Sequence, residues 1–374
     1  MGTQSTEEAI SMKTFLVNGT TETSFMAWLE KGMKEVFSRN GFTLLEDVDE
    51  DLRLVLNFTD TESCRPFRRK AQATFVVSIL ENEGVIENVF KEAYPYLIRS
   101  LSNHLMFVNH DAGTTTFYFL TPEQGCYQIE YKQGDDEARL FQKIYERLEP
   151  LASSQLVIDN DFHFDLPEPL WNGDEVSVQL KKSGKKLDEM DLLPAPFPID
   201  EYLTPRDLRH LHKLYGIGGL SYGNLSARQD ENHFWMSASG IDKSNMSTIG
   251  QDILFIKGYN SIDNKIEVSV PPEVTPKRAS VDAIEHWMIY KEHPEVGAIV
   301  HIHAWMDGIK ATEINYPCGT VELAKTVAEL VRESENPSQA VIGLKNHGLT
   351  ITGTSLEDIF KRIDGKINRQ VPMN

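Results

Sequence analysis

Two histidines separated by one residue, His301 and His303, stand inside the apolar run AIVHIHA. A β-strand points alternate side chains to opposite faces, so residues i and i+2 share one face. Two imidazoles on one face converge on a common point and suit a divalent metal ion such as Zn²⁺. A pair of unrelated, hydrogen-bonded histidines on a buried strand is the structural alternative.

A carboxylate and a third histidine are expected close to this pair. The segment ASVDAIEHWMIYKEH has the apolar spacing of a helix, with Ser280 in the N-cap position and Asp282 in the first turn. The helix should end at the His-Pro pair that follows, directly before the strand with the two histidines. His347 lies between two apolar, β-rich runs in GLKNHGLTITG. Three histidines and one carboxylate predict a zinc site, although another divalent metal is compatible with these ligands.

The segment from about Leu203 to Gln370 resembles the class II aldolase/adducin family, whose members include L-fuculose-phosphate aldolase and L-ribulose-5-phosphate 4-epimerase. The matching stretches occur in order, as GGLSYGNLSAR, SASGID, ASVDAIEHWMIYKEHPEVGAIVHIHA, CGTVELA and LKNHGLTITGTSLEDIF. The resemblance implies that zinc is bound by His301, His303 and His347. It places the acidic residue of the family, a metal ligand at rest and an acid/base group in the reaction, at Asp282.

A glycine-rich segment at residues 218–226 is the next candidate. Glycines let backbone N–H groups approach an anion, and Asn and Ser side chains add donors, although a simple turn is the alternative. In the resembled family the corresponding segments hold the substrate phosphate, which implies this role for Asn224, Ser239, Gly240 and Ser280. The second serine of the family pair is Val281 here, which removes one donor. Lys243 is a candidate replacement, and an exposed lysine in a salt bridge is the alternative.

The expected chemistry follows from the metal. A divalent ion that chelates a hydroxyketone polarises the carbonyl group and stabilises the enediolate formed when the adjacent C–C bond breaks. Asp282 could move a proton at that centre. His286, one helical turn later, either orients Asp282 or is a core histidine with its own hydrogen bonds. We therefore expect an aldolase-type lyase acting on a sugar-like, hydroxylated carbonyl compound, with or without a phosphate group.

Two alternatives remain open at this point. An epimerase, a decarboxylase or a dehydratase would use the same metal site, and the sequence does not separate these reactions. The other alternative is a non-catalytic interaction module like the adducin head. Members of that kind lose the zinc histidines, whereas all three are present here. Because the site residues decide function more than the fold does, their presence argues against the interaction module.

The length of 374 residues is enough for two domains, each with its own core. We expect an α/β protein with an α+β domain of unknown function at residues 12–165, a linker at 166–200 and a metal-binding, class II aldolase/adducin-like domain at 201–374. Within the first domain, a helix should begin at Thr23 or Ser24, and residues 114–132 should form a hairpin. For the second domain, the resemblance implies three α/β/α layers around a mainly antiparallel sheet and a homo-oligomer, of which a tetramer is one form.

The charge and the cysteines limit the possible partners and compartments. A formal net charge of −19 repels nucleic acid and anionic membranes, so neither is expected as a partner. The expected partner is a small, sugar-like substrate molecule. No apolar run has the length of a signal core or of a membrane span. Cys64, Cys126 and Cys318 are odd in number and far apart, so neither a disulfide framework nor a cysteine-based zinc site is expected. Together these features favour the cytoplasm.

Overall fold

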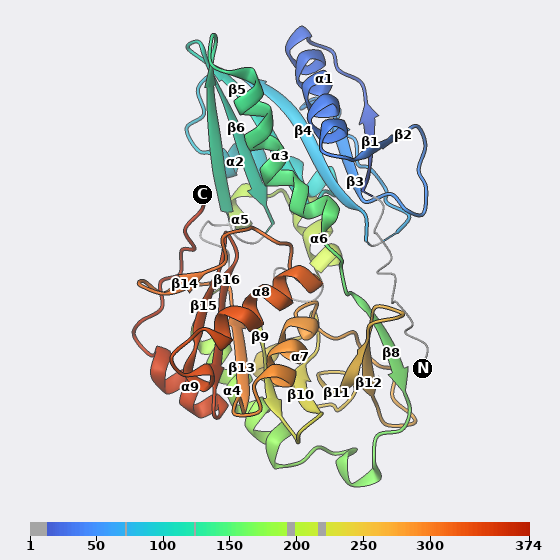
Figure 1. Ribbon diagram of the computed structural model, residues 1–374, viewed down its shortest axis with the longest axis vertical. Helices are drawn as coiled ribbons and strands as arrows, with labels where there is room; N and C mark the ends of the chain where they lie inside the picture. Colours follow the sequence, from blue (N-terminus) through green and yellow to red (C-terminus); the bar gives the residue numbers. More distant parts are fainter. Residues whose placement is uncertain (1–12, 72, 123–124, 193–198, 216–221) are drawn as a thin grey trace, which may run out of the picture.

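The computed structural model describes residues 13–71, 73–122, 125–192, 199–215 and 222–374, which form two sheets covered by helices (Figure 1). The first sheet consists, in spatial order, of β2 (Thr43–Leu45), β1 (Thr14–Gly19), β3 (Leu54–Phe58), β4 (Phe75–Glu83), β5 (His104–Asp111), β6 (Thr114–Thr121) and β7 (Gly125–Lys132). All pairs from β2 to β5 are parallel, whereas β5, β6 and β7 are antiparallel neighbours. The predicted hairpin is confirmed by β6 and β7.

Helices cover both faces of the first sheet. One face is covered by α1 (Ser24–Arg39) and α3 (Glu137–Ser153), and the other by α2 (Val89–Arg99), α5 (Ile199–Tyr202) and α6 (Pro205–Tyr215). Both faces are apolar because successive residues of β5 alternate, with Met106 in the first core and Leu105 and Phe107 in the second. The predicted start of α1 is confirmed, since the Thr23 hydroxyl accepts a hydrogen bond from the Met26 N–H at 3.1 Å.

The second sheet is mainly antiparallel. It consists, in spatial order, of β14 (Lys310–Ala311), β15 (Val341–Leu344), β16 (Gly348–Gly353), β13 (Ala298–Ile302), β9 (Gly223–Arg228), β10 (Phe234–Ser237), β11 (Ile253–Asn260), β12 (Lys265–Ser269) and β8 (Asp159–His163). The two edge pairs, β14–β15 and β12–β8, are parallel, and the inner pairs are antiparallel. The predicted sheet type is confirmed.

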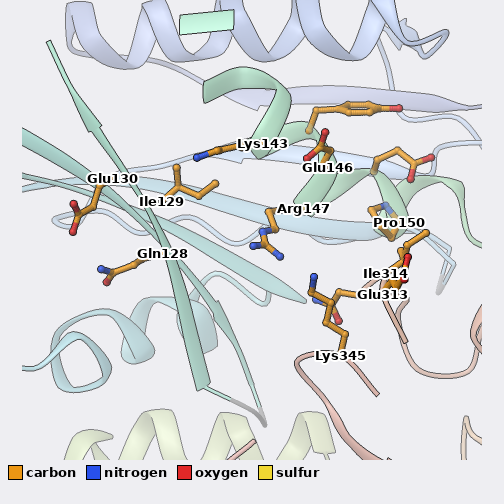
Figure 2. Close-up of a pocket in the computed structure, with 13 residues that line it drawn as sticks. Gln128, Ile129, Glu130, Lys143, Glu146, Arg147, Pro150, Glu313, Ile314 and Lys345 are labelled. Carbon is orange, nitrogen blue, oxygen red and sulfur yellow. The ribbon is translucent and has the colours of Figure 1, made fainter. Parts of the chain in front are cut away.

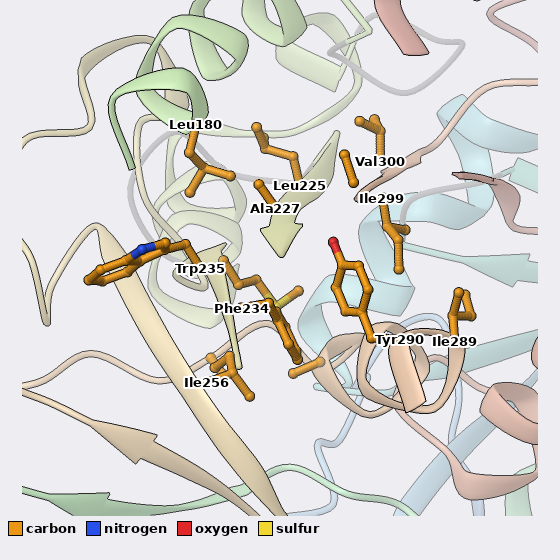
Figure 3. Close-up of a cluster of buried hydrophobic side chains, with 14 of the residues drawn as sticks. Leu180, Leu225, Ala227, Phe234, Trp235, Ile256, Ile289, Tyr290, Ile299 and Val300 are labelled. Atoms are coloured by element: carbon orange, nitrogen blue, oxygen red, sulfur yellow. The ribbon is translucent and has the colours of Figure 1, made fainter. Parts of the chain in front are cut away.

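Helices on both faces of the second sheet complete three α/β/α layers. One face packs against α7 (Ala283–Glu292) and α8 (Val321–Arg332), and the other against α4 (Glu175–Glu189) and α9 (Leu356–Ile363). Tyr290 of α7 meets the Ser226 hydroxyl at 2.8 Å, whereas the Trp235 indole on the opposite face donates to Asp174, the N-cap of α4. Figure 3 shows Tyr290 and Leu180 approaching the strands from different sides. Across the described part of the chain, no helix is long and apolar enough to span a membrane.

The prediction of a linker at residues 166–200 is wrong, because most of this stretch is folded onto the second sheet. It contains α4, whose Leu180 and Leu187 side chains are fully buried. The preceding strand β8, assigned from sequence to the first domain, pairs with β12 instead. The error arose because the four lysines of KKSGKK, which are exposed or half-buried, hide a helix whose apolar residues are few but lie on one face. Residues 193–198 lie outside the described residues.

The helices α5 and α6 also differ from their predicted place in the second domain. Leu203 and Leu211 are buried against α2 on the first sheet. Arg99 of α2 donates three hydrogen bonds of 2.7–3.1 Å to the Asp207 carboxylate of α6. Burial would raise the pKa of Asp207, but hydrogen bonds from Arg99 and Thr204 hold it below its usual value. The chain therefore returns to the first sheet before it completes the second.

A cavity of about 850 Å³ lies between the two folded units (Figure 2). Residues of β7 and α3 form one side, and residues 313–315 with Lys345 form the other. Burial lowers the pKa of Lys345, and the nearby Arg147 guanidinium adds to this effect. Lys345 precedes His347 by two residues, so one wall of the cavity continues into the turn that carries the third predicted histidine.

Candidate metal centre

The three predicted histidines meet at one end of the second sheet. His301 lies on β13, His303 follows that strand, and His347 lies in the turn before β16. One ring nitrogen of each lies within 4.8 Å of the others, and the Nε2 atoms of His301 and His347 are 3.1 Å apart. Two nitrogens on a tetrahedral zinc ion, with bonds of about 2.05 Å, would be about 3.3 Å apart. The structure thus brings the three residues together, and their role as metal ligands remains a proposal.

Strand pairing builds the floor of the site. His301 lies opposite Asn224 of β9 and opposite Thr350 of β16, so the three side chains form a row on one face. Gly223 permits the close pairing, because it has a φ of +140° and a Cβ atom there would lie 2.1 Å from the His301 carbonyl oxygen. Residues 218–221 of the predicted glycine-rich segment lie outside the described residues.

Asp282 stands beside this row at the start of α7. It occupies the N-cap position, so the predicted cap at Ser280 is wrong. The Asp282 side chain does not cap the helix, because its Oδ2 accepts hydrogen bonds from the Asn224 amide at 2.7 Å and the Ser280 hydroxyl at 3.3 Å. Oδ2 lies 3.9 Å from Nε2 of His301. The Asp282 Oδ1 is buried and has no hydrogen-bond partner among the described residues.

The other predicted phosphate-binding residues divide into two groups. Asn224 and Ser280 belong to the Asp282 cluster, since the Asn224 amide also donates to the Ser280 hydroxyl at 3.1 Å. Ser239 and Gly240 form the turn after β10, where the Ser239 N–H donates to the Arg278 carbonyl at 2.9 Å. This bond places the turn beside the segment that leads to Ser280. The Ser239 side chain is exposed.

Lys243 is buried, which contradicts its alternative reading as an exposed lysine. It lies on the short helix η2 (Lys243–Asn245) and is 3% exposed. Its ammonium lies 4.9 Å from the centre of the Tyr222 ring. Burial is the main cause that lowers the pKa of His301, and the positive charge of Lys243 is a minor one. A cation is thus held within electrostatic reach of the histidines.

Two further ionisable residues are buried on α7 behind Asp282. Glu285 accepts a hydrogen bond from the Thr350 hydroxyl, and burial, with the nearby Asp282 charge, raises its pKa to about 8. His286 is hydrogen-bonded to the Ser226 hydroxyl at 2.7 Å, and burial lowers its pKa to about 4. The Nδ1 atom of His286 thus has a partner, as the core alternative predicted, whereas its Nε2 is buried without one among the described residues. Glu285 was missed, although its spacing of three residues from Asp282 places both on one helical face.

Cys318 was also missed as a neighbour of the site. It lies in the loop before α8, and its Sγ is 3.0 Å from Nε2 and 3.3 Å from Nδ1 of His347. Sequence reasoning compared Cys318 only with the two other cysteines, and the three are free thiols in the structure. The signal available in the sequence was its place in the CGTVELA stretch that resembles the family.

The donor set fits a divalent cation. Burial lowers the pKa of both His301 and His347 well below the ordinary value, and the neighbouring histidines add to the effect. Both rings are therefore neutral at pH 7, which is the form that binds a metal. The unpartnered Oδ1 of Asp282 adds a buried oxygen with free lone pairs. Three imidazoles and one carboxylate match the ligand types that zinc prefers.

Part of this site lies in a segment that matches a family of known proteins. The model of the class II aldolase and adducin N-terminal domain matches residues 208–313. A methylthioribulose-1-phosphate dehydratase of Citrobacter koseri is 23% identical over 38% of this chain and 78% of its own length. A 3-oxo-tetronate 4-phosphate decarboxylase of Haemophilus influenzae is 26% identical over 38% and 71%, and an L-fuculose phosphate aldolase of Methanocaldococcus jannaschii is 25% identical over 29% and 68%.

Proposed function

This chain belongs, through its C-terminal part, to the class II aldolase and adducin family, and from that premise we propose that it is a metal-dependent lyase of the aldolase type. Its substrate would be a sugar-like, hydroxylated carbonyl compound. The observation that carries the proposal is that three histidines lie together beside a buried carboxylate oxygen that has no hydrogen-bond partner among the described residues. From the sequence alone we also propose a homo-oligomer that works in the cytoplasm.

The histidines would hold the cation, for which zinc is the proposed metal. His301, His303 and His347 offer three nitrogens from two strand ends, and Asp282 offers an oxygen as fourth ligand in the resting site. A bound divalent cation would polarise the substrate carbonyl and stabilise the negative charge that develops on its oxygen. Two neighbouring strands fix the histidines, so the geometry would change little when substrate binds.

Asp282 is the proposed acid/base group. Its Oδ2 is held by the Asn224 amide and the Ser280 hydroxyl, whereas its Oδ1 has no partner and could take or give a proton at the carbon next to the carbonyl. The two hydrogen bonds orient the carboxylate and exclude rotation during the transfer. Asp282 would thus have two roles, as one of the residues that hold the cation at rest and as the group that moves a proton in the reaction.

Substrate binding is proposed at Asn224, Ser239, Gly240 and Ser280. The Asn224 Oδ1 is buried without a partner, and an acceptor of this kind suits a substrate hydroxyl group better than a phosphate. The exposed Ser239 hydroxyl and the turn at Gly240 offer donors that suit a phosphate. The site therefore supports a hydroxylated substrate with a phosphate group at the end nearer to Ser239.

Dehydration is the second candidate reaction, because the Citrobacter koseri relative is named as a dehydratase. In dehydration, Asp282 would remove the proton from the carbon next to the carbonyl, and the hydroxyl group on the following carbon would leave as water. In aldol cleavage, the hydroxyl group on that following carbon loses its proton as the C–C bond breaks, and Asp282 would give a proton to the carbon next to the carbonyl. Product analysis distinguishes them.

The test is turnover by the zinc-loaded protein with identification of the products. L-fuculose 1-phosphate, methylthioribulose 1-phosphate and related sugar phosphates would be incubated with the protein, and the products identified by NMR. We expect an aldehyde from C–C cleavage, and a rate at least about 100-fold lower in Asp282→Asn. Metal content would be measured for both proteins, so that loss of the ion is distinguished from loss of the proton carrier. Water loss without C–C cleavage would support the second candidate, and equal rates in both proteins would refute the role of Asp282.

A further inference from the structure

We propose that the cavity between the two folded units is a second binding site, which takes a small molecule through a phosphate or carboxylate group held between Arg147 and Lys345. Its volume of about 850 Å³ lies within the range of ligand pockets, roughly 300–1,000 Å³. Among the described residues that line it, none is a proposed ligand of the metal or a proposed substrate contact. The site is therefore separate from the metal centre.

Three cationic side chains line this cavity, those of Lys143, Arg147 and Lys345, and the last two come from different parts of the chain. Arg147 comes from α3 on the first sheet, and Lys345 comes from the turn between β15 and β16 on the second (Figure 2). Figure 2 shows the Arg147 and Lys345 side chains on opposite walls of the cavity. In the described chain, Arg147 donates to the backbone oxygen of Asn374 at 2.5 Å, and neither side chain forms a salt bridge within 4.0 Å. An anion between them would relieve their repulsion and receive charge-assisted hydrogen bonds.

Carboxylates on the same walls restrict the kind of ligand. Glu130, Glu146, Glu149 and Glu313 also line the cavity, so its charge is mixed. Glu313 partly offsets the effect of Arg147 on Lys345. Ionised carboxylates only accept hydrogen bonds, so they suit hydroxyl or ammonium groups on the ligand. The chemical class is therefore a phosphate or carboxylate compound that also carries hydroxyl or amino groups, and the volume leaves room for both parts.

The cavity touches the two segments that surround His347. Lys345 lies two residues before it, and the loop at 313–315 leads to Cys318, whose Sγ contacts the His347 ring. A ligand that draws Arg147 and Lys345 together would restrain the turn of His347. The N-terminal unit would thus contribute one half of a ligand site whose other half is continuous with the metal centre.

The experiment is calorimetric titration of the full-length, zinc-loaded protein. Inorganic phosphate and, separately, succinate would be added at constant ionic strength, which tells the two anionic groups apart. We expect saturable binding of at least one, about tenfold weaker in Arg147→Gln and in Lys345→Gln. Lys291→Gln changes an exposed lysine of α7 and should bind as the unchanged protein does. Absence of binding of both anions would overturn the proposal.

Phosphate could also bind at the metal centre, so two controls separate the sites. Cavity binding should persist in Asn224→Ala and in protein stripped of metal by a chelator. If the Asn224→Ala substitution or the removal of metal abolishes phosphate binding, while Arg147→Gln and Lys345→Gln bind phosphate normally, the proposal is wrong. Arg147→Lys keeps the charge and should retain most of the affinity. Equal loss in Arg147→Lys and Arg147→Gln, with unchanged circular dichroism, would refute a role for the charge.

Discussion

The Nε2 atoms of His301 and His347 lie 3.1 Å apart, although the two residues are separated by 46 positions in the chain. Two neutral imidazoles at this distance can share at most one proton between these nitrogens, whereas a cation between them would engage both lone pairs. The pairing of β13 with β16 fixes this arrangement, since His301 and Thr350 are in register. The sheet itself therefore preorganises the site that we propose for the metal.

Replacement of either histidine should remove the metal. For His301→Ala and His347→Ala we expect zinc content to fall from about one ion per chain to near zero, because two imidazoles and one carboxylate hold zinc more weakly than the complete set of four ligands. Elemental analysis after reconstitution and dialysis measures this, and circular dichroism checks the fold. His233→Ala, at a histidine paired with Asp230 outside the site, should keep its zinc. Unchanged zinc in both site variants would disprove the metal centre.

Glu285→Gln should stabilise the metal-free protein at neutral and higher pH. Burial raises the folded-state pKa of Glu285 to about 8, so the folded carboxyl stays protonated while the unfolded one ionises. Its contribution to the free energy of unfolding therefore decreases as pH rises from about 4.5 to 8. We expect the variant to be more stable by about 1–3 kcal/mol at pH 8 and by much less at pH 5. Urea unfolding measures this difference.

The exposed Glu335 supplies the control for that prediction. Glu335→Gln should show no such change with pH, because its carboxylate is in water in both states. A Glu285→Gln protein that is less stable than the unchanged chain at every pH would mean that Glu285 is ionised in the folded protein.

His104 should make the first unit sensitive to acid. It is 3% exposed on β5, near the Tyr127 hydroxyl, and burial lowers its pKa to about 4. Below pH 6.5 the His104 side chain binds a proton in the unfolded chain but stays neutral in the folded chain. The free energy of unfolding therefore decreases as the pH falls from 6.5 to 4. In His104→Gln this decline should be smaller by up to about 3 kcal/mol. Urea midpoints at pH 7, 6 and 5 test it, with His233→Gln as the control. Identical slopes in His104→Gln and the unchanged protein would contradict the assignment.

Cys318 should be the cysteine that alkylating reagents reach first. Burial raises the pKa of Cys64 to about 11 and that of Cys126 to about 12, so both are poor nucleophiles at pH 8. A carboxamidomethyl group on Cys318 would occupy space at His347 and block zinc binding, and bound zinc should slow the modification. Mass spectrometry of each peptide measures the rates. Cys318→Ser should bind zinc before and after treatment, and modification of Cys64 ahead of Cys318 would argue against the prediction.

Much of the site could be predicted from the sequence, because strand alternation places His301 and His303 on one face regardless of the partner strands. The neighbours of His347 could not, since contacts such as that of Cys318 depend on how a loop folds across 29 residues. Glu285 was hidden for another reason. In a sequence, a glutamate within a helix is interpreted as a surface residue unless the strand that packs against it is known. The partner of Glu285 is Thr350, and the position of Thr350 depends on the register between β13 and β16.

The fold was predictable in its local elements and less so in its long-range order. Caps and turns acting over a few residues fixed the start of α1 and the hairpin of β6 and β7. The helix α4 was read as a linker because lysines dominate its sequence, whereas its structure depends on a few leucines that the second sheet covers. The pairing of β8 with β12 joins residues about a hundred positions apart, and no short-range signal encodes it.

The return of α5 and α6 to the first sheet has a consequence for any attempt to divide the protein. A fragment beginning at residue 201 would lack β8 and α4, which uncovers the edge of β12 and the pocket filled by Leu180. A fragment ending at residue 165 would lack Leu203 and Leu211, which pack against the first sheet, and Asp207, the partner of Arg99. Each half of the sequence contributes elements that pair with or pack on the sheet of the other half, so heat should unfold both units in one cooperative transition. Neither half should fold when it is expressed without the other.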